Sequence, residues 1–449
     1  MEKKIILIRH GKAEPREEVP DEAKRKLTET GIKEIEKILP TLKSHCNGLK
    51  LRLVSSALPR AVQTAELIAN YMGIEEAERL DWVESGDYEG LRETYQSLDP
   101  AYTLAVVGHE PHLSGWSRRL CGSAIPFRKG GAAGFGITSQ EPLSAWPEWM
   151  LLPETVHSKE LKIQPCAAAA SEFRKILRLH CHEVFQALHL FLGAPEDPTT
   201  GHQFRISVRT FRAVLSFIKP LLAPAQYTAV QNQMRQLSNQ MGRLRELDVL
   251  KSEWLKLLNV YPVLEEEQSI LVTVLTSERQ REQDLVYSKR YDMMSVVFDV
   301  WNWIEDVLPQ ETAGMEETEG LLIPQSFSAF SEKRIKKQLK KINAGVEKIT
   351  GNDYAAIHKV RIQIKKLRYT LSIIDPVLKL KREETIALLK SLQNVFGDYC
   401  DTHRNLFILE NLAAPDNSVE MRYESALISG YQIRMMEENL DKIKAIKAV

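Results

Sequence analysis

His202-Gln-Phe-Arg205-Ile-Ser-Val-Arg209-Thr-Phe-Arg212 is a basic segment that recurs later in the chain as His358-Lys-Val-Arg361-Ile-Gln-Ile-Lys365-Lys-Leu-Arg368. Because an α-helix has about 3.6 residues per turn, the four spaced positions of each copy fall within an arc of about 80°. Each copy is therefore predicted to be a helix with a stripe of His, Arg and Lys side chains along one side. Two such stripes on related helices can face one cavity, and such a cavity suits a polyanion.

The match between the two copies continues beyond the basic segments. In the first copy Leu237, Asn239, Gly242 and Glu246 correspond to Leu392, Asn394, Gly397 and Asp401 in the second. A match of this length indicates a duplicated helical unit. Strand patterns are absent from this part of the chain, so it is predicted to be all-α, with breaks at residues 193–201, 220–224 and 309–324.

The part of the chain before the repeat alternates short apolar runs with amphipathic stretches. The expected strands are residues 5–8, 51–54 and 103–107, a closing strand in 129–137 and a last one in 139–156, and the expected helices are residues 28–42 and 59–72. This alternation predicts an α/β fold with a mostly parallel sheet and flanking helices. We therefore expect an α/β domain over residues 1–160, a linker over 161–170 and an all-α domain of two pseudo-symmetric helical bundles over 171–449.

Composition limits where the chain works and what it binds. Its 449 residues contain 60 Lys plus Arg and 60 Asp plus Glu, a formal net charge of +0. Any anion site must then come from local clustering of charge. The five cysteines are scattered and have no metal-binding spacing, which favours a reducing compartment. The first apolar run is too short for a signal peptide and no later run spans a bilayer, so a cytoplasmic protein without a membrane partner is expected.

Three of the predicted strands are followed by residues suited to phosphate chemistry. Arg9-His10-Gly11 follows the first strand, Arg60 lies in Ser-Ser-Ala-Leu-Pro-Arg-Ala-Val-Gln-Thr after the second, and His109 lies in Gly-His-Glu after the third. Ligands of α/β sheets bind beyond the carboxyl ends of the strands, so these side chains are expected to share one region. The combination resembles the histidine phosphatase superfamily over roughly residues 1 to 160, and within it the SixA-type phosphohistidine phosphatases.

The resemblance implies a catalytic role for each of the four residues. His10 would attack phosphorus as a neutral imidazole and become phosphohistidine. Arg9 and Arg60 would hold the phosphoryl oxygens with their forked donors, and His109 would stabilise the charge of the transition state. No metal or organic cofactor is expected, because the arginines supply the positive charge.

Further candidates for this site are less well defined by the sequence. Arg25 lies where short members of the superfamily carry another pocket arginine, and Gly11 completes the first triplet. Larger members use a carboxyl group to protonate an alcohol leaving group, and Glu84 and Asp87 are the candidates here, with Glu84 ranked first. A small domain without a substantial insertion over its pocket suits a macromolecular phosphohistidine substrate.

The duplicated basic pattern resembles the CHAD domain, an all-α family named for its histidines, over about residues 168 to 449. This resemblance implies two four-helix bundles with a basic channel between them and inorganic polyphosphate as the ligand. The implied polyphosphate-binding residues are the eight of the two stripes: His202, Arg205, Arg209, Arg212, His358, Arg361, Lys365 and Arg368. Arg243, Arg245 and Lys366 are added as lower-ranked candidates. Lys365 stands where the family has arginine. A lysine keeps the positive charge but cannot donate two parallel hydrogen bonds as a guanidinium does.

Other partners are not favoured by the residues. The stripes lack the interleaved aromatic side chains on which single-stranded nucleic acid stacks, so nucleic acid is not expected as a partner. The lysine-rich stretch at residues 333–341 is interpreted as a solvated helix face. His180 and His182 would point about 200° apart on a helix, so no shared metal ion is expected there.

These observations predict a phosphatase that acts through a phosphohistidine intermediate on phosphohistidine or another phosphorylated protein or small molecule. The helical domain is expected to bind polyphosphate and to localise the enzyme, including to polyphosphate-rich bodies in the cytoplasm. Two alternatives stay open: a polyphosphate-binding protein with a degenerate phosphatase scaffold, and a polyphosphate hydrolase that is fed by the helical domain.

Overall fold

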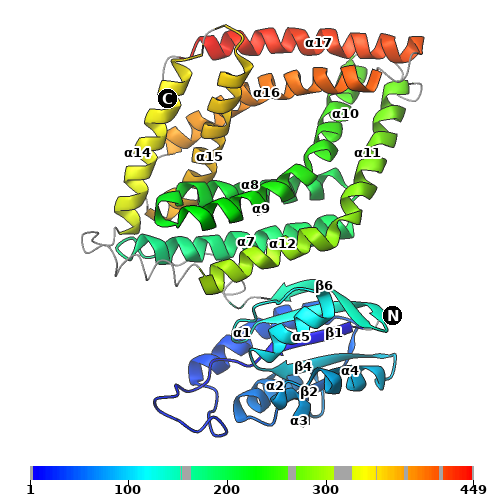
Figure 1. Ribbon diagram of the computed structural model, residues 1–449, viewed down its shortest axis with the longest axis vertical. Helices are drawn as coiled ribbons and strands as arrows, with labels where there is room; N and C mark the ends of the chain where they lie inside the picture. Colours follow the sequence, from blue (N-terminus) through cyan, green and yellow to red (C-terminus); the bar gives the residue numbers. More distant parts are fainter. Residues whose placement is uncertain are drawn as a thin grey trace. The chain divides into compact units, whose positions relative to one another are not determined.

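A computed structural model describes residues 4–151, 153, 163–260, 269–307, 326–349, 351–378, 383–413 and 418–446. The chain divides into two compact units. The first comprises Met1–Lys162 together with Trp301–Glu305, and the second comprises Ile163–Val300 and Asp306–Val449. Figure 1 shows strands in the first unit and long helices in the second.

A six-stranded sheet in the order β3-β2-β4-β1-β5-β6 forms the centre of the first unit. Its strands are β1 (Lys4–Arg9), β2 (Lys50–Ser55), β3 (Glu78–Arg79), β4 (Tyr102–Gly108), β5 (Ala132–Gln140) and β6 (Leu143–Leu151). The first four strands in the sheet order pair in parallel, and β5 and β6 add an antiparallel edge. The α/β prediction and the five predicted strands are confirmed. The pattern missed β3, which has two exposed residues and no apolar run.

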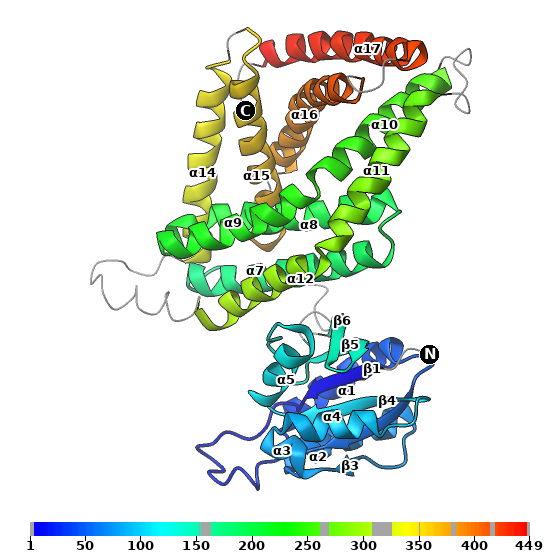
Figure 2. The ribbon, with the colours of Figure 1, turned by 45° about the vertical axis from the view of Figure 1, so that its right-hand side comes forward.

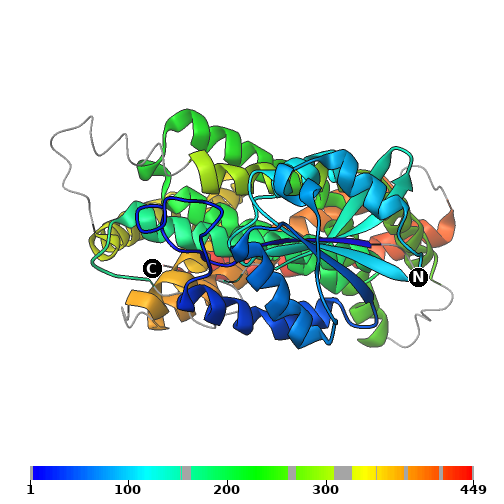
Figure 3. The same cartoon turned by 90° about the horizontal axis from the view of Figure 1, so that it is seen from below.

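Helices cover both faces of this sheet (Figure 3). They are α1 (Glu29–His45), α2 (Pro59–Met72), α3 (Asp81–Ser85), α4 (Tyr88–Gln96) and α5 (His112–Cys121). The apolar faces of α1 and α2 pack with alternate residues of the strands, such as Ile6, Ile8 and Leu53, in one buried core. The period of two along each strand sends the intervening residues to the opposite face. The two predicted helices are confirmed.

The register of the parallel strands brings together the segments that carry His10, Arg60 and His109. Arg9 at the end of β1 pairs with Gly108 at the end of β4, and Ser55 at the end of β2 pairs with Val107. The backbone N–H of His10 also donates to the carbonyl of Gly108, 3.2 Å away. The residues that follow β1, β2 and β4 therefore emerge at one edge of the sheet.

The second unit is helical throughout its described residues. Its α-helices are α7 (Ala169–Gly193), α8 (Pro198–Phe217), α9 (Pro224–Gln240), α10 (Gly242–Val260), α11 (Ile270–Ser288), α12 (Arg290–Asn302), α14 (Phe327–Val346), α15 (Tyr354–Leu378), α16 (Glu383–Ala413) and α17 (Val419–Lys444), with a 3-10 turn η1 (Lys219–Leu221) after α8 and a π-helical turn η3 (Trp303–Val307) after α12. The end of α12 and the start of η3, Trp301–Glu305, belong to the first unit. The all-α prediction is confirmed. No helix among the described residues is long and apolar enough to cross a membrane.

Several predicted boundaries shift in the structure. The break expected over residues 193–201 is shorter, because Asp197 caps α8 through the N–H of Thr199 and the helix starts at Pro198. Pro is well suited to the first position of a helix, where its missing N–H costs nothing. Helix α7 starts at Ala169, inside the expected linker. The loop expected over residues 309–324 lies outside the described residues.

Both copies of the basic segment lie on helices as predicted, the first on α8 and the second on α15. In each copy another helix precedes and packs on the basic one, α7 on α8 and α14 on α15 (Figures 1 and 2). The copies differ after the basic helix: α9 and α10 are separate helices that meet at Gly242, whereas α16 runs without interruption through the matching Gly397. Phe173 of α7 packs on Phe327 and Phe330 of α14, which joins the two halves through an aromatic core.

Candidate functional site

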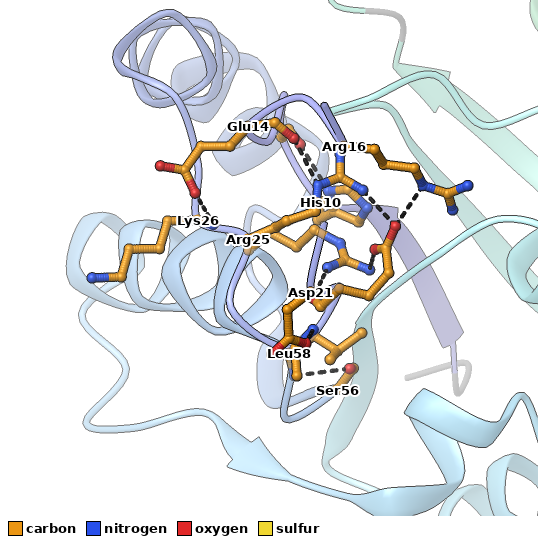
Figure 4. A network of polar contacts seen from close by, with 12 residues as sticks. His10, Glu14, Arg16, Asp21, Arg25, Lys26, Ser56 and Leu58 are labelled. Carbon is orange, nitrogen blue, oxygen red and sulfur yellow. Dashed lines mark hydrogen bonds and ion pairs between the residues drawn. The ribbon is translucent and has the colours of Figure 1, made fainter. Parts of the chain in front are cut away.

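His10 lies directly after β1, and its ring is held in one tautomer. The Nδ1 of His10, which is labelled in Figure 4, is 2.7 Å from the carbonyl oxygen of Gly11. A carbonyl oxygen can only accept, so Nδ1 must carry the proton and Nε2 must carry the lone pair. The side chain is 7% exposed. The sequence thus places a neutral, oriented imidazole with a nucleophilic nitrogen at the edge of the sheet.

His109 follows β4 and faces this ring, with 5.0 Å between the two ring centroids. The pKa of His10 is lowered to about 3, mainly by burial and to a smaller extent by His109, Arg60 and Arg9. Burial likewise lowers the pKa of His109 to about 4, and Arg60 is the strongest of the cations that add to the shift. Both imidazoles are therefore neutral near pH 7.

Polar atoms without partners gather at the same place. Both ring nitrogens of His109 and the Nε of Arg9 are buried and have no hydrogen-bond partner among the described residues. Buried polar groups are nearly always satisfied, so an unsatisfied set points to a ligand that completes it. The remaining end of Arg9 is fixed, because one Nη donates to the carbonyl of Phe127 at 2.7 Å. Burial lowers the pKa of both Arg9 and Arg60 from the ordinary arginine value.

The loop between β1 and α1 brings a carboxylate into this group of arginines, which the sequence analysis did not anticipate. Glu22 accepts from Arg16 Nε at 2.6 Å and from Arg25 Nη1 at 2.7 Å through one oxygen, and its other oxygen is 3.0 Å from Arg60 Nη2. The Nη1 of Arg60 also donates to the backbone carbonyl of Glu22 at 2.8 Å. Figure 4 shows Arg16 and Arg25 approaching from the same loop. No motif marks Glu22, so only the folded loop reveals it.

The lower-ranked candidates of this site have defined contacts. The Nε of Arg25 donates to the carbonyl of Glu14, and its Nη1 donates to the carboxylate of Glu22. Arg25 therefore fixes the backbone of the loop and also the Glu22 side chain. The N–H of Gly11 donates to Thr64, and a Cβ at this glycine would lie 2.9 Å from Ile35 of α1, so close packing requires glycine here. The missing side chain therefore lets the segment that carries His10 sit against α1.

The two carboxyl candidates for a general acid differ in their contacts. Glu84 is exposed on α3, and its charge partly offsets the larger lowering of the Arg60 pKa by burial. The carboxylate of Asp87 accepts a hydrogen bond from the N–H of Glu89 and caps the N-terminus of α4. Asp87 is thus better explained as a helix cap than as an acid.

In the second unit, a cavity of about 480 Å³ is enclosed by α8, α10, α15 and α16, and we call it the central pocket. Three residues of each predicted stripe line it: His202, Arg205 and Arg209 from α8, and His358, Arg361 and Lys365 from α15. Arg245, a lower-ranked candidate, lines it too, and Arg404 and Tyr354 are lining residues that the sequence analysis missed. The expectation that both stripes face one cavity is therefore confirmed for these six residues.

The ends of the two stripes do not belong to this pocket, which corrects the expectation for Arg212 and Arg368. The Nε of Arg212 donates to Gln231 at 3.2 Å, and that of Arg368 donates to Gln393 at 2.7 Å. Each stripe therefore extends along its helix past the residues that line the pocket. Arg243 and Lys366 do not line the central pocket either.

Cations outnumber anions in the central pocket, and their crowding is visible in the pKa values. The pKa of Lys365 is lowered to about 7, mainly by burial and to a smaller extent by Arg361 and Arg209. Burial also lowers the pKa of Arg205 to about 10. An anion that entered the pocket would relieve this repulsion and would favour the protonated form of Lys365.

Two carboxylates neutralise part of this charge. Asp401 pairs with Arg361, and Glu246 pairs with Arg404 at 2.9 Å. These are the two acidic positions that correspond in the sequence repeat, so the match reflects a shared role in holding a pocket arginine. Among the described residues there is no group of three or more His, Cys, Asp or Glu side chains placed to hold a metal ion.

The fold and these sites define a two-domain protein with an α/β domain that carries a cluster of histidines and arginines and a helical domain with a basic pocket. The family described as the CHAD domain matches residues 175–407, and the histidine phosphatase superfamily (branch 1) matches residues 5–114. The chain belongs to the CHAD domain family, and its N-terminal part is a histidine phosphatase superfamily domain fused to it. A comparison with curated proteins finds no match.

Solved structures are similar to each domain separately. The CHAD domain from the plant Ricinus communis is 20% identical and covers 65% of this chain and 98% of its own, with a TM-score of 0.50. PptA from Streptomyces chartreusis is 14% identical and covers 62% of this chain and 98% of its own, with a TM-score of 0.46. The protein histidine phosphatase SixA complexed with tungstate is 21% identical and covers 34% of this chain and 99% of its own, with a TM-score of 0.32.

Proposed function

We propose that this protein is a phosphatase that works through a phosphohistidine at His10, and that its helical domain binds inorganic polyphosphate. The observation that carries the first part is the pair of neutral histidines at the strand ends. The Nδ1–H of His10 is engaged by Gly11, and His109 beside it has two unpartnered nitrogens. The match to the histidine phosphatase superfamily supports the same conclusion.

In the proposed reaction, the Nε2 lone pair of His10 attacks the phosphorus of the substrate. The N–P bond forms as the bond from phosphorus to the leaving atom breaks, and the leaving atom keeps the electron pair. Water then attacks the phosphohistidine, releases inorganic phosphate and restores neutral His10. Arg9 and Arg60 would bind the equatorial oxygens through forked donors, and His109 would donate a hydrogen bond as charge builds up on them.

Glu22, the carboxylate inside the group of arginines, is poorly suited to protonating an alkoxide. Burial would raise the pKa of Glu22, but hydrogen bonds from Arg16 and Arg25 outweigh it, and the net pKa is lowered. A phosphorylated imidazole leaves as a neutral ring once its other nitrogen takes a proton from solvent, so it needs no acid from the protein. This favours phosphohistidine over a phosphate ester of an alcohol as the substrate.

The polyphosphate part of the proposal rests on the central pocket and on membership of the CHAD domain family. Arginine forks along two helices match the repeated oxygens of a phosphate chain. We infer that this domain localises the phosphatase to polyphosphate-rich bodies, where tethering raises the local concentration of the enzyme to about millimolar. Tight binding of internal phosphates opposes the sliding that hydrolysis from a chain end requires.

Phosphate release from a panel of substrates tests this proposal. The panel holds a phosphohistidine peptide, a small phosphoester and long-chain polyphosphate, and the enzymes are the full chain and its Arg209→Ala/Arg361→Ala variant. We expect release mainly from phosphohistidine, at equal rates for both enzymes in dilute solution. Fast polyphosphate hydrolysis that is lost in the variant would instead identify a polyphosphate hydrolase. No release from any substrate by the full chain would identify a degenerate scaffold.

Glu22 should compete with phosphate for the arginines of the pocket. In Glu22→Gln the side chain keeps its size and loses its charge, so Arg25 and Arg60 no longer have to leave an anionic partner. Partly exposed ion pairs contribute about 0.2–1 kcal/mol each, so the loss of two pairs should tighten inhibition by orthovanadate or inorganic phosphate by about twofold to thirtyfold.

The matched control for Glu22→Gln is Glu18→Gln, an exposed carboxylate of the same loop. It should leave the inhibition constant unchanged, because its side chain is outside the group of arginines. Weaker inhibition of Glu22→Gln than of the unmodified protein would mean that the carboxylate positions the arginines for phosphate and does not compete with it.

A further inference from the structure

A second basic cavity lies on the other side of α15, where α9, η1 and α14 approach it, and we call it the side pocket. Its volume is about 500 Å³, similar to that of the central pocket. Its lining includes six cationic side chains: Lys219, Arg334, Lys337, Lys341, Lys359 and Lys366. No carboxylate is among its lining residues. The stretch at residues 333–341, interpreted from the sequence as a solvated face, supplies three of these cations.

Among the described residues, no carboxylate lines the side pocket to neutralise its charge. Within the described parts of the chain, none of its five lysines forms an ion pair with a carboxylate. In the central pocket, by contrast, Asp401 and Glu246 each pair with an arginine. Ordinary charged helix faces interleave both signs, so a concave surface with one sign alone points to an anionic ligand.

Several of these cations are held in place before any ligand arrives. Arg334 donates to the carbonyls of Phe217 and Ser216 at the end of α8, at 2.9 and 3.3 Å. Lys219 lies over the ring of Tyr227, 4.9 Å from its centroid. Fixed donors lose little conformational freedom when they bind, which favours binding of an ordered row of phosphates.

The two pockets meet at one residue. His358 lines both of them, and along α15 the residues Arg361 and Lys365 face the central pocket whereas Lys359 and Lys366 face the side pocket. His358 is therefore the point at which a chain of phosphates bound in the central pocket would reach the cations of the side pocket. Tyr227 is the one Phe, Tyr or Trp among the described residues that line the side pocket, which gives little support for stacked nucleobases.

We propose that the side pocket is a second anion site, which binds the part of a long inorganic polyphosphate chain that extends beyond the central pocket. This inference rests on the proposed binding of polyphosphate in the central pocket. It assigns a role in chain-length selection to the side pocket: a short oligophosphate is held by the central pocket alone, and a long chain engages both. Lys366, judged from the sequence a lower-ranked polyphosphate residue, then acts in this second site.

The test is a comparison of two ligands on the full chain. Tripolyphosphate and long-chain polyphosphate are titrated into the unmodified protein, Lys337→Gln/Lys341→Gln, and the control Lys336→Gln/Lys340→Gln. The control lysines are exposed on the same helix and line neither pocket. We expect the side-pocket variant to bind the long chain at least about tenfold more weakly, with a salt slope reduced by about 2, because two phosphate contacts are lost. Its affinity for tripolyphosphate and both affinities of the control should stay unchanged.

Other results would overturn the inference. Equal losses for the short and long ligands, or equal losses in the control, would make the side pocket part of a diffuse surface charge. Unchanged long-chain affinity in the side-pocket variant would show that the chain does not enter it. A single-stranded oligonucleotide that depends on Lys337 and Lys341 while polyphosphate does not would assign the pocket to nucleic acid. Failure of the unmodified protein to bind either phosphate ligand would instead refute the proposed function itself.

Discussion

His10→Ala is expected to abolish phosphate release, with a loss of at least about 10³-fold in kcat. The substitution removes the nitrogen to which the phosphoryl group is transferred, and no neighbouring group can replace a nucleophile of this kind. His109 is 5.0 Å away by ring centroids, but its place in the pocket suits it to stabilising charge on the oxygens. Substrate binding should persist, because Arg9 and Arg60 remain.

The intermediate itself gives an independent measurement. Unmodified protein quenched during turnover should carry one phosphate that is labile in acid and stable in alkali, and His10→Ala should carry none. His45→Ala, an exposed histidine of the same domain, is the matched control and should keep full activity. Turnover by His10→Ala at the unmodified rate would refute the mechanism, and normal thermal unfolding of the variant would exclude loss of the fold as the cause.

Arg209→Ala/Arg361→Ala is expected to weaken binding of long-chain polyphosphate by about 10²- to 10⁴-fold. Each charged hydrogen bond to phosphate contributes about 1.5–3 kcal/mol, and two facing helices each lose one donor group. Loss of Arg361 also leaves Asp401 without its cation, which adds an uncompensated negative charge to the central pocket. The slope of log affinity against log salt concentration should fall by about 2, because each phosphate that is no longer contacted keeps its condensed counterions.

The control for this variant is Lys336→Ala/Lys340→Ala, which removes the same charge from an exposed helix face outside both pockets. Equal effects of the two variants would show that overall charge, and not the central pocket, binds the ligand. Binding should also weaken as pH rises through 7, because the pKa of Lys365 is about 7 in the free protein and an anion raises it. Internal phosphates of a long chain do not titrate there, so the pH dependence reports on the protein.

The domain organisation followed from patterns that the chain carries locally. Apolar runs and helical spacing depend on near neighbours, so five strands and the principal helices could be predicted from them. Arg9-His10-Gly11, Arg60 and His109 could be placed in one site because parallel strands deliver their carboxyl ends to one edge. β3 could not be predicted, because two exposed residues carry no periodic signal.

The internal repeat carried the corresponding information for the helical domain. Matched positions on α8 and α15 predicted a shared cavity, and the helical period fixed which side of each helix would face it. How far the cavity extends along each helix was not encoded in the spacing. Arg212 and Arg368 satisfy the pattern, yet they bind glutamines of neighbouring helices beyond the end of the pocket.

The sequence by itself thus determined the two folds, the grouping of His10 with Arg9, Arg60 and His109, and the two basic helices. Tertiary structure alone decided that Glu22 is bound by three arginines, that Nδ1 of His10 is protonated, and that Lys337 and Lys341 line a concave pocket. The physical reason is the range of the interactions. Periodicity and strand order depend on residues that are near one another in the sequence. The other features depend on side chains from distant segments, which come close together and lose water only when the chain is folded.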